Sequence, residues 1–185
     1  MKVLIDTNVL YPTVLREVVL GVAGTGAFRP LWSARILEEW ARAARKIGPD
    51  GEAQARAEIA ALSADWPGRE VAVPEALAAR LWLPDPADVH VLAAAIAGSA
   101  DVILTLNAKD FPRGTLAEEG LSRADPDSFL LGHFKADPEA VARAAEAVLA
   151  EARRLSDSGW RMRPLLKKAG LPRLGKALAA HLGDG

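Results

Sequence analysis

A chain of 185 residues, half of them hydrophobic, can bury a sizeable core as one domain or as one domain with an appendage. The absence of cysteine excludes disulfides, thiolate zinc sites and a thiol nucleophile, so we expect any bound metal to be held by oxygen. An acid at position six argues against a signal peptide, and no stretch reaches the roughly 18 uncharged apolar residues of a membrane helix, which predicts a soluble, cytoplasmic protein.

The net charge of -1 is unevenly distributed along the chain. Residues 1–134 carry 13 basic and 18 acidic side chains, a balance of -5, whereas residues 135–185 carry 10 and 6, a balance of +4. Between Arg153 and Lys176, eight basic residues stand against the single acid Asp157. Such a density can follow a phosphate backbone, and a solvated helix face or a partner-binding tail explains it equally well.

Strand and helix patterns alternate along the first 134 residues. Apolar runs predict strands at residues 2–5, 28–32, 70–73, 101–106 and, more weakly, 121–124. Helical spacing and capping residues predict helices at 12–23, 33–47, 52–64, 74–81, 89–97 and 127–134. This alternation predicts a three-layer α/β/α sandwich with a mainly parallel five-stranded sheet.

The pattern changes after the last of these elements. Two helical stretches follow, at 138–155 and 163–182, and Gly170-Leu171-Pro172 should break the second into two short helices. We therefore predict an α/β domain over residues 1–134 and a basic helical extension over residues 135–185.

Three acids stand where a parallel sheet would bring them together. Asp6 ends the first strand, Asp88 opens an almost wholly apolar helix, and Asp110 follows the fourth strand. Strand ends at one edge of such a sheet form the ligand crevice. Carboxylates gathered there repel one another and stay ionised mainly when a divalent cation neutralises them, which favours a metal-dependent phosphodiesterase.

Four motifs, taken in order, carry a family resemblance. They are Leu4-Ile5-Asp6-Thr7-Asn8-Val9-Leu10, Trp32-Ser33 followed by Ile36-Leu37-Glu38-Glu39-Trp40, Pro84-Asp85-Pro86-Ala87-Asp88-Val89-His90-Val91-Leu92-Ala93-Ala94-Ala95, and Thr105-Leu106-Asn107-Ala108-Lys109-Asp110-Phe111. Over residues 1–134 the chain resembles PIN-domain ribonucleases of the VapC toxin kind. The C-terminal helices resemble, more loosely, the extension of a longer VapC-like subgroup.

The resemblance implies an Mg²⁺- or Mn²⁺-dependent endoribonuclease that leaves a 5′-phosphate and a 3′-hydroxyl. It implies the toxin of a type II toxin-antitoxin pair, with a small antitoxin protein as partner and homodimers common. Its four catalytic, metal-binding acids fall on Asp6, Glu39, Asp88 and Asp110. Helix geometry does not separate Glu38 from Glu39, since both flank the apolar stripe, and the resemblance alone selects Glu39.

Each acid also has a structural interpretation. Asp6 is suited to bond the amides of Thr7 and Asn8 in a turn. Both glutamates of the second motif can pair with arginines on their helix. Asp85 is suited to be an N-cap with Pro86 at the first helical position, and Asp88 then falls at the third, so capping and metal binding are compatible.

Further polar residues lie beside the acids. The candidates for holding carboxylates or water are Thr7, Asn8, Ser33, Asp85, Thr105 and Asn107, each equally plausible as a cap or turn residue. The candidates for phosphate contacts are Arg16, Arg35, Lys109 and Arg113, of which the first two also fit exposed helix positions. We interpret His90 as a packed or hydrogen-bonded histidine rather than a metal ligand.

Two other functions fit parts of the sequence. A PIN-like module without catalytic activity would bind RNA or protein through its basic C-terminal part, but pure binding would tolerate loss of the four acids. A phosphohydrolase with an aspartyl nucleophile also begins with an acid after its first strand. Such enzymes typically need a second aspartate two residues later, where Asn8 stands.

Overall fold

The computed structural model describes residues 1–183 and divides into two compact units. Unit 1 comprises residues 1–11 and 29–124, and unit 2 comprises residues 12–28 and the chain from residue 125 onward. This division does not coincide with the predicted boundary after residue 134, because helix α2 (Thr13–Gly24) packs against helix α9 (Pro138–Leu155) in unit 2. The division into a domain of residues 1–134 and an extension stays a prediction.

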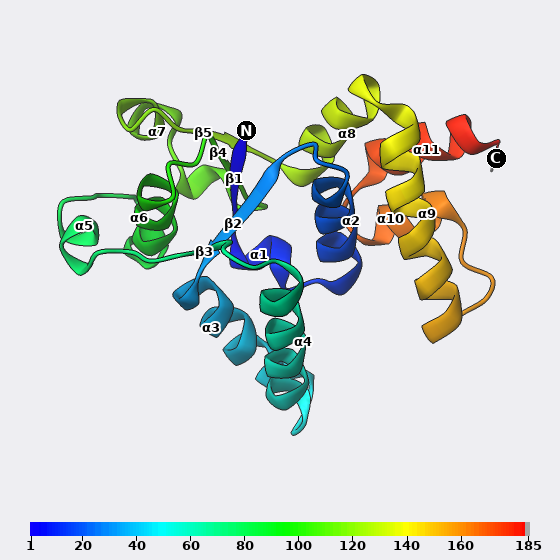
Figure 1. The fold of residues 1–185 in the computed structure, drawn as a ribbon, viewed down its shortest axis with the longest axis horizontal. Helices are drawn as coiled ribbons and strands as arrows, with labels where there is room; N and C mark the ends of the chain where they lie inside the picture. Colours follow the sequence, from blue (N-terminus) through cyan, green and yellow to red (C-terminus); the bar gives the residue numbers. More distant parts are fainter. Residues whose placement is uncertain (184–185) are drawn as a thin grey trace. The chain divides into compact units, whose positions relative to one another are not determined.

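A five-stranded sheet forms the centre of unit 1 (Figure 1). Its strands are β1 (Lys2–Ile5), β2 (Arg29–Ser33), β3 (Glu70–Val71), β4 (Val102–Leu104) and β5 (Ser122–Ala124). They lie in the order β3-β2-β1-β4-β5, and all four neighbouring pairs are parallel. Three consecutive residues of β1, Val3, Leu4 and Ile5, have no exposed surface, so both faces of the sheet are covered. The predicted α/β class is confirmed.

Six α-helices and three 3₁₀ helices complete unit 1. They are α1 (Thr7–Leu10), α3 (Ala34–Ala43), η1 (Ala44–Ile47), α4 (Gly51–Asp65), α5 (Glu75–Ala79), η2 (Pro86–Asp88), α6 (Val89–Ala97), η3 (Ala108–Asp110) and α7 (Arg113–Glu118). Helix α6 packs against β1, β2 and β4. A Cβ atom on Gly98, directly after α6, would lie 3.0 Å from the side chains of Leu31 and Val71, so a glycine lets the helix end approach the sheet closely.

Helices α1 and α7 were not predicted from the sequence. Each has six residues or fewer, too short for a hydrophobic periodicity to show. The one-turn helix α1 matters for the site, because it follows β1 directly and carries Thr7 and Asn8.

Unit 2 contains α2, α8 (Pro126–Ala136), α9, α10 (Met162–Lys168) and α11 (Pro172–Leu182). The predicted break at residues 170–172 is confirmed, since α10 ends before it and α11 begins with Pro172. Buried Asp127 of α8 caps α11 by accepting the amides of Arg173 at 3.0 Å and Leu174 at 2.9 Å. Among the described residues, no helix is both long enough and apolar enough to cross a membrane.

Candidate active site

The strand order locates the candidate site. From β1 the chain proceeds outward to β2 and β3, and then returns to place β4 on the other side of β1. The direction of winding therefore reverses between β1 and β4, and parallel sheets bind ligands beyond the carboxyl ends of the strands at such a point. Ile5 lies opposite Leu104 in this pair, so Asp6 and Thr105 follow at the same edge.

Asp6 is held at this edge by two side chains. It is 5% exposed, and its Oδ2 accepts hydrogen bonds from Asn8 Nδ2 and Thr105 Oγ1, both at 2.7 Å. Burial raises the pKa of Asp6, which the bond from Thr105 only partly opposes, and the charge of Glu39 raises it further. The backbone amide of Thr7 also lowers the pKa of Asp6, in line with the turn interpretation, but Asp6 makes no regular capping bond to α1, and its bonds from the side chains of Asn8 and Thr105 go beyond that role.

Three more carboxylates meet nearby and are called the acidic cluster below: Asp85, Asp88 and Asp110. Each offers an oxygen within 4.8 Å of the other two. The pKa of Asp88 rises to about 6, first because the group is partly buried and then because Asp6, Asp85 and Asp110 repel its charge. Asp6 and the cluster therefore share one negative field.

Two of these acids, Asp85 and Asp88, were predicted to lie at the start of a helix, Asp85 as its cap and Asp88 in its first turn. Asp85 caps η2 as predicted, with its Oδ1 accepting the amide of Ala87 at 2.9 Å and Pro86 at the first position. Asp88 is the third residue of η2, the position predicted for it when Asp85 is the cap. It directly precedes α6 and makes no side-chain capping bond to that helix, and the first turn is a separate 3₁₀ helix rather than part of α6.

Glu39 is engaged through both of its oxygens. Oε1 lies 2.8 Å from Nε2 of His90 on α6, and Oε2 accepts from Thr7 Oγ1 at 3.1 Å. Arg35 is more distant, at 3.6 Å. Burial would raise the pKa of Glu39, but the bonds from His90 and Thr7 more than offset this effect and lower it. Glu39 is thus ionised and oriented by α1 and α6.

His90 is hydrogen-bonded, as interpreted from the sequence, and is not among the clustered metal-ligand candidates of the described residues. Its side chain is buried, and its Nδ1 has no hydrogen-bond partner within residues 1–183. The pairing of His90 with Glu39 was not predicted. No local pattern connects residues 39 and 90, because only the packing of α3 and α6 in the folded unit brings them together.

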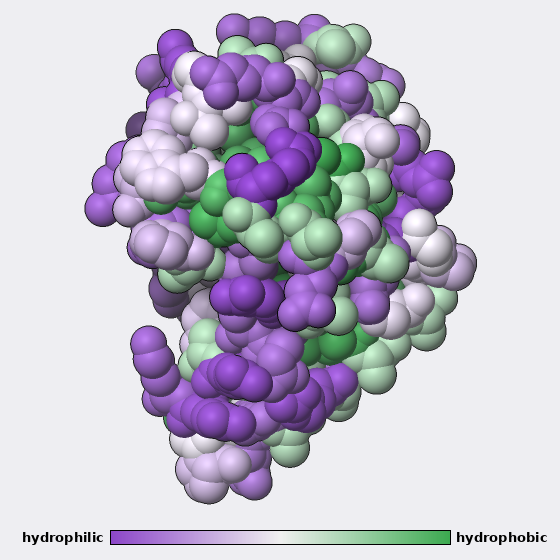
Figure 2. All heavy atoms as spheres, turned by 90° about the vertical axis from the view of Figure 1, so that its left-hand side faces the viewer, coloured by the Kyte–Doolittle hydropathy of each residue, from purple (hydrophilic) through white to green (hydrophobic). Residues whose placement is uncertain are grey.

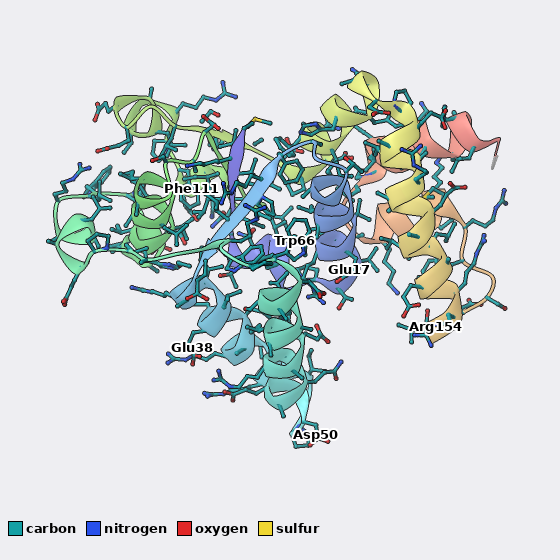
Figure 3. The ribbon with its side chains drawn as sticks, in the orientation of Figure 1. Glu17, Glu38, Asp50, Trp66, Phe111 and Arg154 are labelled. Atoms are coloured by element: carbon teal, nitrogen blue, oxygen red, sulfur yellow. The ribbon has the colours of Figure 1, made fainter. Side chains whose placement is uncertain are left out.

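Glu38, which helix geometry alone could not separate from Glu39, has different surroundings. Figure 3 shows it on α3, and it binds Arg42 of the same helix at 2.8 Å and Arg56 of α4 at 2.9 Å. These two arginines lower the pKa of Glu38 to about 2. The predicted arginine pairing of Glu38 is confirmed.

The supporting residues divide into two groups. Thr7, Asn8, Thr105 and Asn107 each donate a hydrogen bond to an acid, with Asn107 bonding Asp110. Ser33 instead caps α3 by accepting the amide of Ile36 at 3.3 Å, so it acts as the plain cap that the sequence also allowed.

The phosphate-contact candidates also differ in exposure. Arg35, Lys109 and Arg113 are exposed on unit 1. Arg16 is only 4% exposed and pairs with Glu17 at 3.2 Å. Its interpretation as an exposed helix residue is therefore wrong, and its guanidinium has little surface to offer a phosphate. Buried apolar neighbours along α2 explain this, since most residues of that helix are buried.

The donor set fits a hard divalent cation. Every side chain of the acidic cluster and Asp6 offers carboxylate oxygen, which Mg²⁺ and Mn²⁺ prefer. A cation would relieve the mutual repulsion that raises the pKa of Asp88.

Comparison with protein families decides the interpretation, because the PIN domain matches residues 2–109, more than half of the chain. The chain belongs to the PIN domain family. Membership indicates a nuclease-type function, since PIN domains are generally metal-dependent nucleases whose acidic residues bind divalent cations. No curated protein and no solved structure matches the chain.

Proposed function

We propose that this PIN-domain protein is an Mg²⁺- or Mn²⁺-dependent endoribonuclease that hydrolyses RNA phosphodiester bonds. The observation that carries the proposal is the convergence of Asp6 and the acidic cluster at the reversal point of the sheet, where the pKa of Asp88 rises to about 6. Structural carboxylates are normally paired, and repelling carboxylates are typical of a site that a cation completes.

In this proposal Asp6, Asp88, Asp110 and Glu39 hold the cation, and Asp85 joins them through its place in the acidic cluster. A cation held there would supply the Lewis acidity that polarises a phosphodiester and activates a water for attack. Thr105 and Asn8 fix the direction of the Asp6 carboxylate, and Asn107 fixes that of Asp110. Thr7 and His90 do the same for Glu39, so the acids are oriented before substrate binds.

Two observations disfavour the alternative functions, a phosphohydrolase with an aspartyl nucleophile and a PIN-like module that only binds RNA or protein. The amide of Asn8 bonds Asp6 through Nδ2 and accepts the Leu106 amide through Oδ1 at 3.0 Å, so it stabilises the site without supplying a second acid for aspartyl phosphoryl transfer. A pure binding module would not need repelling carboxylates, which disfavour a polyanionic ligand.

We further propose the role of toxin in a type II pair, with a small antitoxin as partner and cytoplasmic RNA as substrate. The order of motifs in residues 4–111 supports this assignment through its likeness to VapC toxins. The basic extension of residues 135–185 is then an appended module that adds positive charge to an acidic nuclease domain.

The test is Asp6→Asn, with Glu38→Gln as the matched control. Asp6→Asn should abolish Mn²⁺-dependent cleavage of RNA while its circular dichroism stays that of wild type, and Glu38→Gln should cleave normally. Cleavage by a folded, nuclease-free preparation of Asp6→Asn at the wild-type rate would refute the proposal.

A further inference from the structure

Large apolar side chains are exposed on both segments that supply the acidic cluster. Over residues 1–183 the exposed large hydrophobic residues are Met1, Ile47, Trp82, Leu106 and Leu155. Trp82 precedes Asp85 by three residues and is 68% exposed, and Leu106 precedes Asp110 by four and is 51% exposed. Scattered exposed apolar residues are ordinary on protein surfaces, but here two of them lie within four residues of a member of the acidic cluster along the chain.

The chain limits how far these side chains can lie from the acids. At about 3.6 Å per residue, the Cα atom of Trp82 lies within about 11 Å of that of Asp85. The amide of Leu106 donates to Asn8 Oδ1 at 3.0 Å, and Asn8 in turn donates to Asp6 at 2.7 Å. Leu106 is therefore two hydrogen bonds from the Asp6 carboxylate.

Trp82 is exposed although the chain around it is anchored. Leu83 beside it is buried, and Asp85 caps η2 shortly afterwards. Trp32 and Trp40, by contrast, are buried in the core of the same unit. Figure 2 views the side of unit 1 that carries α5, α6 and α7, and shows apolar surface bordered by hydrophilic side chains there. A tryptophan exposed to water three residues from Asp85 offers a flat, sequence-tolerant contact surface.

Electrostatics decides which ligand suits this surface. The acidic cluster and Asp6 repel an RNA backbone wherever a cation does not neutralise them, so contacts that do not depend on charge add affinity next to these acids. Stacking of a base on an aromatic ring is such a contact, and its loss weakens binding by about fivefold to 100-fold per base. Bases inside a duplex are already stacked on each other, and unpaired bases are free to take this place.

We propose that Trp82 is a stacking platform for an unpaired nucleobase next to the cleaved phosphate, with Leu106 as a second apolar contact. This inference rests on the proposed ribonuclease function and assigns Trp82 as the residue that an unpaired base of the RNA contacts. Stacking sets the position of the phosphate relative to the acids, and a duplex of the same sequence lacks the free base.

The experiment measures the binding of a fluorescein-labelled single-stranded RNA decamer, and of the corresponding duplex, by fluorescence anisotropy. The protein is the full chain carrying Asp6→Asn, in Mg²⁺, so that the RNA stays intact. In this background Trp82→Ala should raise the Kd for the single strand about fivefold to 100-fold, whereas Trp82→Phe should stay within about threefold. The matched control is Ile47→Ala, which removes another exposed apolar side chain and should leave the Kd unchanged.

The intrinsic fluorescence gives a second readout. RNA should quench part of the tryptophan emission, and Trp82→Ala should remove that part. Equal Kd values for Trp82→Ala and Ile47→Ala, or an equal effect of Trp82→Ala on single strand and duplex, would overturn the stacking platform. Unchanged RNA cleavage by Trp82→Ala, with cleavage lost in Asp6→Asn, would overturn it and leave the proposed function standing. If Trp82→Ala weakens binding of the single strand but no form of the protein, wild type included, cleaves RNA with metal, the proposed function is refuted and Trp82 remains an RNA contact.

Discussion

Two groups of carboxylates in unit 1 have the same chemistry and opposite surroundings. Asp85 and Asp110 of the acidic cluster and Asp6 all repel the charge of Asp88, and partial burial together with this repulsion raises its pKa to about 6. On α3 and α4, Glu38 and Glu52 each meet two arginines, and the pKa of each falls to about 2. The difference shows that the counter-charge, rather than the number of acids, separates a cation site from a solvated salt-bridge network.

The largest expected effect that separates the two groups of carboxylates is a loss of cation affinity in Asp88→Asn. Asp88→Asn keeps the shape of the side chain and removes its charge, so we expect Mn²⁺ affinity to fall at least about 10- to 100-fold in calorimetric titrations. Without metal this variant should be at least as stable as wild type, because a repelled carboxylate is gone. Glu38→Gln should bind Mn²⁺ like wild type, and an equal loss in both variants would remove the basis of the comparison.

A second variant tests how Glu39 is held, since this acid is bound most closely by a histidine and a threonine, unlike the repelled Asp88 or the arginine-paired Glu38. His90→Ala removes the donor at 2.8 Å and leaves a cavity beside Glu39, so the free energy of unfolding should fall by about 1–3 kcal/mol in urea denaturation. Cleavage should slow by about tenfold or more, as for other residues that orient metal ligands.

Arg35→Ala is the matched control for His90→Ala. Arg35 approaches the same carboxylate at 3.6 Å from an exposed position, so its loss should change stability little. An equal loss of unfolding free energy in the two variants would show that the bond from His90 holds Glu39 no more firmly than the exposed Arg35 does.

The pH dependence of cation binding follows from Asp88. Its pKa is about 6 in the folded protein and 3.8 in the absence of the fold, so below pH 6 the folded site holds a proton that a cation displaces. Mn²⁺ affinity should therefore fall by up to about tenfold per pH unit below pH 6 and level off above it. The metal-free protein should lose stability as the pH rises from about 4 through 6, as Asp88 ionises against its neighbours.

Titrations of Mn²⁺ between pH 5 and 8 measure this dependence, with Asp88→Asn as the variant in which it should flatten. Glu38, whose pKa is about 2, stays ionised throughout this range. An unchanged pH profile in Asp88→Asn would assign the dependence to another group.

The strands and most helices could be predicted because their signals are local. The apolar run Val3-Leu4-Ile5 and the apolar helix before Gly98 each specify their own element, and the alternation of elements specifies a parallel sheet. The ends of the strands then bring Asp6 and Asp110 to one edge. The short helices α1 and α7 escaped prediction because one or two turns show no periodicity.

The details of the site depended on contacts that sequence spacing does not encode. Glu38 and Glu39 are equivalent on an isolated helix, and partners from other elements make them different: Arg56 on α4 for Glu38, and Thr7 on α1 and His90 on α6 for Glu39. Likewise, Arg16 was a candidate for a phosphate contact or an exposed helix position, and the packing of α2 in unit 2 buries it. Partners supplied by other elements, rather than propensity, decided these positions.

The smallest expected effect is on the thermal stability of a variant in the arginine-paired group of acids, Arg56→Ala. Arg56 bridges Glu38 at 2.9 Å and Glu52 at 2.6 Å, but all three side chains are substantially solvated, so water and salt screen their attraction. Arg56→Ala should therefore keep the thermal midpoint within about 2 °C of wild type, with normal cleavage. Each glutamate still has a second arginine, Arg42 for Glu38 and Arg45 for Glu52, so no new cation site should arise. The contrary outcome is that Mn²⁺ raises the thermal midpoint of Arg56→Ala and still does so in the double variant Arg56→Ala/Asp88→Asn. Mn²⁺ would then bind at Glu38 and Glu52, and the loss of one arginine would be enough to turn these glutamates into a cation site.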